Sequence, residues 1–547
     1  MRAVRWTGLA VVVALLACAS GCSSKRGKPG EKGEKGEKGE LTDVANVKVS
    51  PAGSAAEPER PREPAMIAKA GGPKLGAVKM SVVIRERPDP RSSQLGYLRV
   101  GQKLTRAEKP TAFDACQGGY YEVLPRGYVC VDEGATLDES HPLLKATLRA
   151  PDRSKPLPYA YAFVRAIAPR YYRLPTFKEQ QQYEMALDRN LRSFDRLKEK
   201  WLGYEVGAND VPTDAFGLVI GEAPAEAPEL DDNERFGGVS GGKVPWYFES
   251  GRKIPNVSNF AVPDYAVITN RIKRHAGVAL IDAFPGEKRH FALTTDLRLI
   301  PTSKLKPGRG SPFHGVELGN KGWTLPLGFA RKDDVSHYEK LPGSRFKRIK
   351  TRLAYGAPIQ LTGESKGESE RRYVETTEGT WMKASDLAIA AKTSSLPTFA
   401  KGNLKWVDVS ILRQTLTLFE GDKAIFVTMV STGKDGLGDP KTTHSTPVGT
   451  FKIREKHITA TMDSQSLGSE FELQDVPWVE YFQGGYALHA AYWHTEYGRP
   501  RSHGCINLSP IDAHRIFGWT DPPVPEGWHG TTAGESMGDG TTVHVHP

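Results

Sequence analysis

Alternating apolar and polar positions recur along the chain and predict a protein built mainly of β-strands. Residues 405–411 alternate in this way, which is the period of a strand with one buried face. The apolar runs 416–419 and 424–428 flank Glu420-Gly421-Asp422, a sequence typical of a hairpin turn. We therefore expect a mostly β, multi-domain fold whose last domain covers residues 404–547.

Residues 76–140 contain short β-rich runs separated by Pro, Gly and Asp, and they predict one small all-β module. The module resembles the bacterial SH3-like fold, and the resemblance rests on Arg85-Glu86-Arg87-Pro88 and on Gly127-Tyr128-Val129-Cys130. Cys116 and Cys130 are a close pair within it. In an oxidising compartment we expect them to form a disulfide. A zinc site is the alternative, although no third or fourth ligand is nearby in sequence.

One segment departs from the β pattern and predicts a long helix over residues 176–202. Thr176 and Glu179 form a capping box at its start, and Gly203 ends the run. The apolar side chains between them recur at helical spacing, and we interpret that stripe as packing with no ligand role. The helix lies within residues 141–260, which we interpret as a mixed segment.

An internal echo links residues 291–305 with residues 373–387. Both copies contain an aromatic residue, Thr-Thr followed by an acid, an apolar pair, a serine and a leucine in the same frame. Each copy is interpreted as a strand, a turn and a second strand. We therefore predict a duplicated, SH3-like β-module over residues 261–392.

The first residues have the pattern of a secretory signal. Arg2 and Arg5 precede the apolar run 9–17, which is too short to span a bilayer as a helix. The small residues after it lead to Cys22 and resemble a bacterial lipobox, while Cys18 offers a second register. We expect lipid attachment at Cys22, because a hydrophilic stretch begins directly after it. Ordinary cleavage with incidental cysteines is the alternative.

The signal peptide is expected to cover residues 1–21 and a disordered tether residues 22–75. The tether includes five Gly-X-Y triplets at residues 27–41, which is the collagen period. Five triplets are few for a stable triple helix, so we interpret them as part of a charged, solvated linker.

Composition narrows the class of protein. The 547 residues are 39% hydrophobic and 25% charged, which is typical of globular domains and excludes a largely disordered chain. At roughly 150 residues per domain, this length suggests about three or four domains. The formal net charge of +10 suits an acidic partner or surface. Of the five cysteines, Cys505 is left without a partner, and an odd thiol in an exported protein is a candidate for chemistry.

The residues around Cys505 suit nucleophilic catalysis. A cysteine attacks as its thiolate, and an imidazole such as that of His489 can take the proton, so that the two form a thiolate–imidazolium pair. Gly504 permits a sharp turn that presents backbone N–H groups to an oxyanion. Ser509-Pro510-Ile511-Asp512 is a helix start with serine at the N-cap. We therefore expect Cys505 on a tight, partly exposed loop just before a helix.

These residues resemble the YkuD-type L,D-transpeptidases of bacterial cell walls. The motif is Ser502-His503-Gly504-Cys505-Ile506-Asn507, with His489 sixteen residues before the cysteine. The resemblance implies that Cys505 is the nucleophile and that His489 accepts and later donates the proton. It also implies that His503 braces the loop, which Ser502 and Gly504 complete. Further family-like pieces lie within the last 140 residues or so, at 430–433, 444–451, 475–478, 481–482 and 540–543.

The sequence departs from the family pattern at two positions. Ala490 stands where Gly or Ser is frequent, so a backbone carbonyl or another group is expected to orient His489. Asn507 stands where many members carry Arg, although some carry Asn. We assign substrate binding to a group of side chains expected near the cleft: Ser502, Asn507, His494, Trp493 and Tyr481.

The resemblance implies acyl transfer on peptidoglycan stem peptides, with no cofactor and no metal. Cys505 would attack the carbonyl before the terminal D-Ala of a tetrapeptide, release D-Ala and keep the acyl group as a thioester. An amine of a neighbouring stem peptide would then form a 3→3 crosslink. With water as the acceptor the enzyme would be an L,D-carboxypeptidase, and with a lysine of a wall protein it would attach that protein to the wall.

The same interpretation places the chain in wall biogenesis and cell shape. We expect it on the periplasmic side of the cell envelope, held to a membrane by its N-terminal lipid, with the outer membrane favoured. No nucleic-acid partner is expected.

Other classes of function stay open at this point. Papain-like cysteine peptidases place the cysteine before the histidine, whereas here His489 precedes Cys505. A wall-binding scaffold with an inactive catalytic domain is a second alternative, and the intact pair counts against it. A zinc cluster is a third, and it would use residues to which the family gives no metal role: His444, His489, His494, His503 and Cys505.

Overall fold

The computed structural model describes residues 63–547 apart from short gaps and one longer one. The predicted signal peptide, the lipid site at Cys22 or Cys18 and most of the tether lie outside the described residues. No helix in the described part is long and apolar enough to cross a bilayer. The gaps are residues 133, 147–148, 199–233, 239–242, 253–256, 258–261, 320–321, 344, 392–395 and 465–470.

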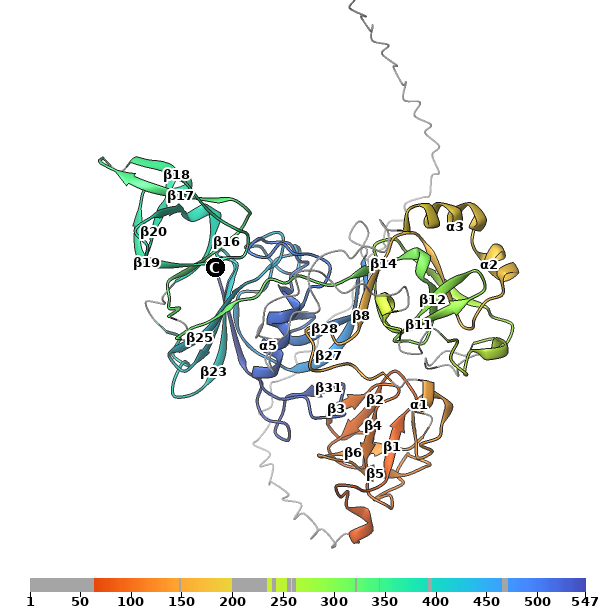
Figure 1. Cartoon of the computed structure of the whole chain (residues 1–547). Coiled ribbons are helices and arrows are strands. Elements are labelled where there is room, and N and C mark those ends of the chain that lie inside the picture. Colours follow the sequence, from red (N-terminus) through yellow and green to blue (C-terminus); the bar gives the residue numbers. More distant parts are fainter. Residues whose placement is uncertain are drawn as a thin grey trace, which may run out of the picture. The chain divides into compact units, whose positions relative to one another are not determined.

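The described chain is mostly β-structure arranged in several sheets, which confirms the predicted fold class (Figure 1). We divide it into three upstream β-units and a C-terminal domain. Single-turn 3-10 helices punctuate the chain at Pro64–Met66 (η1), Glu234–Phe236 (η2), Glu249–Gly251 (η3), Thr302–Lys304 (η4), Ser369–Arg371 (η5) and Ala384–Asp386 (η6).

The first β-unit contains seven short strands, and the short helix α1 (Pro142–Ala146) follows it. It begins earlier than predicted, because β1 starts at Lys74 and the Lys109 N–H donates to the Ala65 carbonyl at 2.9 Å. Residues 63–75 therefore belong to this unit and not to a disordered tether. The strands are β1 (Lys74–Ala77), β2 (Val82–Arg85), β3 (Gln94–Leu98), β4 (Lys103–Thr105), β5 (Tyr120–Glu122), β6 (Tyr128–Cys130) and β7 (Ala135–Thr136).

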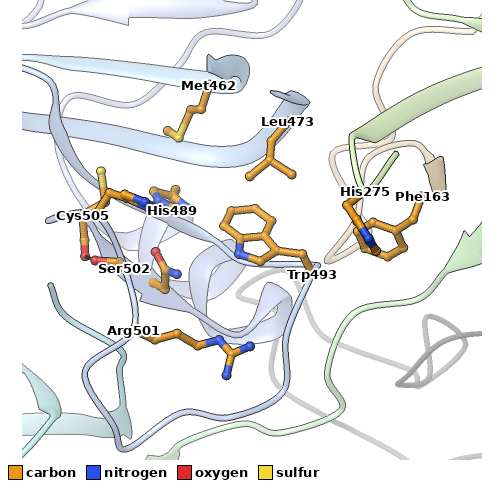
Figure 2. A pocket seen from close by; sticks show the side chains of 11 residues that line it. Phe163, His275, Met462, Leu473, His489, Trp493, Arg501, Ser502 and Cys505 are labelled. Atoms are coloured by element: carbon orange, nitrogen blue, oxygen red, sulfur yellow. Dashed lines mark hydrogen bonds between the residues drawn. The ribbon is translucent and has the colours of Figure 1, made fainter. Parts of the chain in front are cut away.

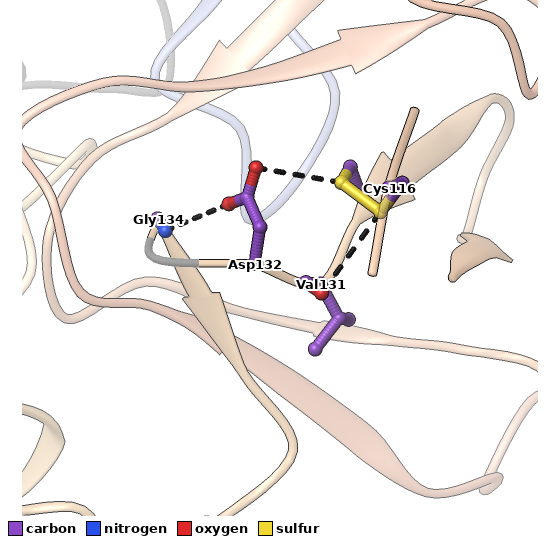
Figure 3. The surroundings of a disulfide bond; sticks show 5 residues. Cys116, Val131, Asp132 and Gly134 are labelled. Atoms are coloured by element: carbon purple, nitrogen blue, oxygen red, sulfur yellow. Dashed lines mark hydrogen bonds between the residues drawn. A yellow bond between two sulfur atoms is a disulfide. The ribbon is translucent and has the colours of Figure 1, made fainter. Parts of the chain in front are cut away.

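A disulfide joins Cys116 to Cys130 in this unit, with their Cα atoms 5.9 Å apart (Figure 3). It ties the loop before β5 to the end of β6. Beside it the Asp132 carboxylate accepts a hydrogen bond from the Gly134 N–H at 2.8 Å. With both sulfurs in the disulfide, this pair offers no thiolate to a zinc ion. The SH3-like character of the unit stays a prediction.

The second β-unit is an antiparallel set of strands that combines residues from both sides of the predicted boundary at 260. β8 and β9 lie in the segment interpreted as mixed, yet β8 pairs with β11 and β14, and β9 pairs with β10 and β13. The predicted division into 141–260 and 261–392 therefore cuts through one sheet. The strands are β8 (Ala160–Val164), β9 (Ala168–Tyr171), β10 (Ile268–Ile272), β11 (Gly277–Gly286), β12 (Arg289–Thr294), β13 (Leu299–Pro301) and β14 (Leu305–Gly308).

The predicted long helix is two short helices, α2 (Phe177–Tyr183) and α3 (Leu187–Arg196). The Thr176 capping box is present at the start of α2. The break follows from Glu184, whose extended backbone turns its carboxylate inward to accept hydrogen bonds from Arg289 and from the Tyr171 hydroxyl. Ala186 adopts φ 53° to restart the helix. Because the apolar spacing continues across this break, the sequence pattern did not reveal it.

The third β-unit contains the second copy of the internal echo. Each copy forms a strand, a turn, a second strand and a 3-10 turn: β12, β13 and η4 in the second unit, and β20, β21 and η6 here. The two copies lie in different sheets, so they do not form one module over 261–392. The strands are β16 (Leu327–Ala330), β17 (Val335–Leu341), β18 (Arg345–Leu353), β19 (Pro358–Lys366), β20 (Tyr373–Thr376), β21 (Trp381–Lys383) and β22 (Leu387–Ala390).

The C-terminal domain consists of two sheets and the helix α5 (Pro510–Trp519), all of whose residues are buried except Gly518. The predicted hairpin at Glu420–Asp422 joins β24 to β25. One sheet contains β15 (Val316–Glu317), β23 (Lys405–Ser410), β24 (Thr415–Glu420), β25 (Lys423–Met429), β26 (Gly449–Lys452) and β32 (Thr542–His546). The other contains β27 (Glu455–Ser464), β28 (Phe471–Gln483), β29 (Tyr486–Ala490), β30 (Ile506–Leu508) and β31 (Gly530–Thr532).

Strand pairing joins the upstream units to this domain. β31 pairs with β3 of the first unit, and β28 pairs with β11 of the second. A buried polar cluster lies at the junction of all three parts. Arg99 donates to the Asp475 carboxylate at 3.0 Å, Thr459 donates to the same carboxylate at 2.8 Å, and the Tyr161 hydroxyl donates to the Asp475 carbonyl at 2.6 Å.

Candidate active site

Parallel pairing of β29 with β30 closes the sequence gap between the predicted base and nucleophile. In this register His489 lies opposite Asn507, two residues after Cys505. The sheet thus carries His489 on one strand and Cys505 at the entrance to its neighbour. Helix α5 packs behind both strands, and its Ser509 N-cap accepts a hydrogen bond from the Asp512 N–H at 3.1 Å, as predicted.

The loop before Cys505 is held by hydrogen bonds within the motif. Ser502 Oγ accepts from the Gly504 N–H at 3.0 Å and donates to the Cys505 carbonyl. Gly504 has φ 119°, and a Cβ there would lie 2.5 Å from Cε1 of Tyr486. Both the backbone angle and the contact require glycine. Ser502 and Gly504 therefore shape the turn that presents Cys505.

His489 is buried and its orientation is set by a backbone carbonyl. Its Nδ1 lies 3.1 Å from the Ala490 carbonyl oxygen, which can only accept, so Nδ1 carries the proton and Nε2 is the basic nitrogen. This is the kind of carbonyl contact expected from the presence of alanine at position 490. Burial lowers the pKa of His489 to about 4, although the Ala490 hydrogen bond opposes this shift. The ring is therefore a neutral base at physiological pH.

Cys505 is half-buried, and its thiol lies 3.7 Å from the Gly485 carbonyl oxygen. Burial raises the pKa of the Cys505 thiol to about 11. With the pKa of His489 near 4, the resting pair is a neutral thiol beside a neutral imidazole. This differs from the thiolate–imidazolium pair expected from the sequence, because neither side chain has a counter-charge to offset its burial.

A cavity of about 430 Å³ opens beside Cys505. In Figure 2 it extends from Cys505 and His489 past Trp493 to Phe163 and His275. Six of its wall residues are predicted site residues: His489, Trp493, Ser502, His503, Cys505 and Asn507.

Sequence reasoning missed the other five wall residues: Phe163, His275, Met462, Leu473 and Arg501. Arg501 adjoins the motif and could have been found from its position. Phe163, Met462 and Leu473 come from distant strands and His275 from the turn between β10 and β11, and nothing local in the sequence marks them.

Two predicted substrate-binding residues do not line this cavity. His494 is buried behind Asn507, whose amide nitrogen lies 3.1 Å from its Nε2, and burial lowers the pKa of His494 to about 3. His494 therefore supports Asn507. Tyr481 lies on β28, and its ring centroid is 5.5 Å from that of His457.

His503 lines the cavity, and its ring packs edge-on against His444, with 4.7 Å between centroids. This contact gives the motif loop a second support besides Ser502. Burial and the neighbouring His444 lower the pKa of His503. Across the residues that the structure describes, no group of three or more His, Cys, Asp or Glu side chains is arranged to hold a metal ion.

The comparison with known protein families gives a match over the C-terminal domain. Residues 404–545 match the family model described as the YkuD L,D-transpeptidase catalytic domain. The C-terminal domain therefore belongs to the YkuD family of L,D-transpeptidase catalytic domains. Residues 63–403 lie outside that match.

Individual relatives are distant. The chain is 26% identical over 194 residues to "Putative L,D-transpeptidase YciB" of Bacillus subtilis, a match that covers 32% of this chain and 93% of the relative. Among solved structures, an L,D-transpeptidase of Xylanimonas cellulosilytica is 21% identical, with a TM-score of 0.20, over 29% of this chain and 64% of that one. The catalytic domain of the E. faecium L,D-transpeptidase is 24% identical, with a TM-score of 0.20, over 26% of this chain and 98% of that one.

Proposed function

We propose that this protein is a peptidoglycan L,D-transpeptidase that forms 3→3 crosslinks through a thioester on Cys505. The observation that carries the proposal is the pairing of β29 with β30, which sets the buried base His489 beside Cys505 at a substrate-sized cavity. Membership of the C-terminal domain in the YkuD family supports the same reaction class.

The first half-reaction moves the acyl group from the donor to the enzyme. As the sulfur of Cys505 attacks the carbonyl before the terminal D-Ala, its proton passes to Nε2 of His489. The tetrahedral intermediate then collapses, the C–N bond breaks, and His489 returns the proton to the amine of the leaving D-Ala. Because both groups are neutral at rest, the proton transfer accompanies the attack and does not precede it.

The second half-reaction releases the acyl group to an amine. The acceptor nitrogen attacks the thioester carbonyl, His489 takes the amine proton, and the C–S bond breaks. The proton then returns to the sulfur, so the thiol is regenerated. Water or a protein lysine would use the same geometry, and the products of the reaction distinguish these acceptors.

The test of this function uses the mature chain and tetrapeptide-containing muropeptide dimers. We expect mass analysis to show release of D-Ala and a product with a 3→3 link. A product that has only lost D-Ala, without crosslinking, would identify an L,D-carboxypeptidase instead. Intact substrate together with tight binding would indicate a wall-binding scaffold and contradict the proposal.

The proposed location is the periplasmic side of the cell envelope, with a lipid on Cys22 and the outer membrane as the favoured site. The basis is the N-terminal sequence, where small residues after an apolar run precede Cys22. Growth with a fatty-acid analogue should label the protein, and Cys22→Ala should remove the label. Labelling that persists in this variant would move the lipid to Cys18, and an unlabelled wild type would contradict the anchor.

A further inference from the structure

The cavity beside Cys505 has a wall that the C-terminal domain does not supply. Phe163 of β8 and His275, in the turn between β10 and β11, line it together with Cys505 and His489. Figure 2 shows both side chains beyond Trp493, at the end of the cavity away from Cys505. The family match begins at residue 404, so this wall belongs to the chain's own second β-unit.

Backbone contacts fix this wall in place. His275 adopts a left-handed backbone with φ 70°, a conformation that costs energy for a residue with a side chain and recurs at functional sites. Its N–H donates to the Val164 carbonyl at 2.7 Å, which holds the turn against β8. Two residues later Gly277 pairs with Leu473, itself a wall residue of the cavity. The His275 turn and the Leu473 wall of the cavity are therefore joined through the sheet.

The chemistry of this end of the cavity suits a chain that is aliphatic in the middle and anionic at its end. Met462, Leu473 and Phe163 give it an apolar surface. The imidazole of His275 lines the far end and can donate a hydrogen bond to an anionic group, while Lys273 and Arg274 precede it in the same exposed turn without lining the cavity. A carboxylate is the group that such a turn attracts.

The position of His489 shows which substrate approaches from this side. In the proposed mechanism His489 protonates the amine of the leaving D-Ala and later takes a proton from the incoming amine, so the acceptor follows D-Ala on the His489 side of Cys505. The ring of Trp493 lies next to His489, with 5.6 Å between their centroids, and the cavity continues past Trp493 to Phe163 and His275. The acceptor therefore lies along this path.

We propose that the second β-unit forms the acceptor subsite. The aliphatic side chain of the acceptor's diamino acid lies along the apolar surface, and a carboxylate of the same stem peptide binds at the His275 turn. This inference rests on the proposed function and adds an acceptor site that the second β-unit shares with the catalytic domain.

The test compares His275→Asn with Lys288→Ala in the full mature chain. Asparagine tolerates the left-handed backbone but lacks the ring. Lys288 is a matched control, because it is an exposed residue of the same β-unit with φ 62° that does not line the cavity. We expect His275→Asn to raise the acceptor KM by about tenfold, the effect of losing a hydrogen bond to a charged group. The rate of D-Ala release from the donor should stay unchanged, and Lys288→Ala should behave as the wild type.

The outcomes separate this inference from the proposed function. An unchanged acceptor KM in His275→Asn, or an equal loss in donor acylation, would overturn the acceptor subsite while leaving the reaction intact. If Cys505 of the wild type is never acylated, the proposed function fails. The acceptor subsite is then tested by measuring the binding of a stem peptide. In that case calorimetry should show that a free stem tetrapeptide binds the Cys505→Ala chain more weakly when His275→Asn is added. Equal binding in the two would contradict the subsite.

Discussion

Burial leaves the titratable groups of one polar centre of this protein neutral, whereas those of a second centre stay charged. At the active site, Cys505 and His489 have no counter-charge, and burial shifts their pKa values to about 11 and about 4, so both are neutral. At the junction of the units, burial also opposes the charge of Asp475. There, however, Arg99 and the hydrogen bonds hold the pKa of Asp475 below its usual value. A buried group without a counter-charge stays neutral and can exchange protons, whereas a compensated one holds structure.

The largest effect that we expect is the loss of activity when Cys505, the proposed nucleophile, is replaced. Cys505→Ser should abolish both turnover and the mass adduct of a carbapenem, because a serine hydroxyl is far less acidic than a thiol and a neutral His489 activates it poorly. Intact-protein mass spectrometry measures the adduct, and an unchanged melting temperature shows that the fold is kept. Full crosslinking activity in this variant would refute the mechanism.

Breaking the Arg99–Asp475 pair at the junction should lower the stability of the fold. Arg99→Met leaves the Asp475 charge buried without its partner, and we expect the free energy of unfolding to fall by about 3–5 kcal/mol. Denaturant unfolding measures this loss. Lys452→Met is the control, since it breaks an exposed pair with Asp539 and should cost less than about 1 kcal/mol. Equal losses in the two variants would show that the junction cluster is not a structural centre.

Removal of the base should slow chemistry without unfolding the protein. His489→Ala should reduce the rate of acylation by a factor of about 10² or more, the scale of a lost general base. His494→Ala should cost much less, because His494 does not line the cavity and contacts Asn507 from behind it. Stopped-flow acylation by a carbapenem compares the two. A larger loss in His494→Ala would move the base assignment to that residue.

The pH dependence should differ between the two centres. Acylation should be nearly flat from about pH 5 to pH 10, since His489 loses its base form only near pH 4 and Cys505 ionises only near pH 11. An inflection between about pH 6 and pH 9 would instead show a thiolate–imidazolium pair at rest.

Stability gives the matching measurement at the junction. Because the folded pKa of Asp475 is lowered, its contribution is complete above the unfolded pKa of about 4 and is lost as the pH falls further. Unfolding curves at a series of acidic pH values should therefore show a steeper loss in the wild type than in Asp475→Asn. Parallel curves would contradict a charged Asp475 in the fold.

Local signals in the sequence predicted much of the site and fold. The capping residues Thr176 and Ser509 mark helix starts, and the alternation over 405–411 becomes β23. What the sequence could not reveal depends on contacts between distant segments. Glu184 breaks a helix because it binds Arg289, which lies more than a hundred residues further along the chain. His275 reaches the cavity because β11 pairs with β28. The spacing of residues within a short stretch of sequence does not indicate which distant residues they will contact.

The pairing of β3 with β31 has a consequence for how the chain matures. Thr531 donates a hydrogen bond to the Leu95 carbonyl, 436 residues earlier in the sequence. The first β-unit therefore keeps an open strand edge until nearly the whole polypeptide has been synthesised. A chain cut short before residue 530 would leave β3 paired with β2 alone, and its other edge would be open to aggregation or proteolysis. Completion of the C-terminus is thus the step that protects the N-terminal unit.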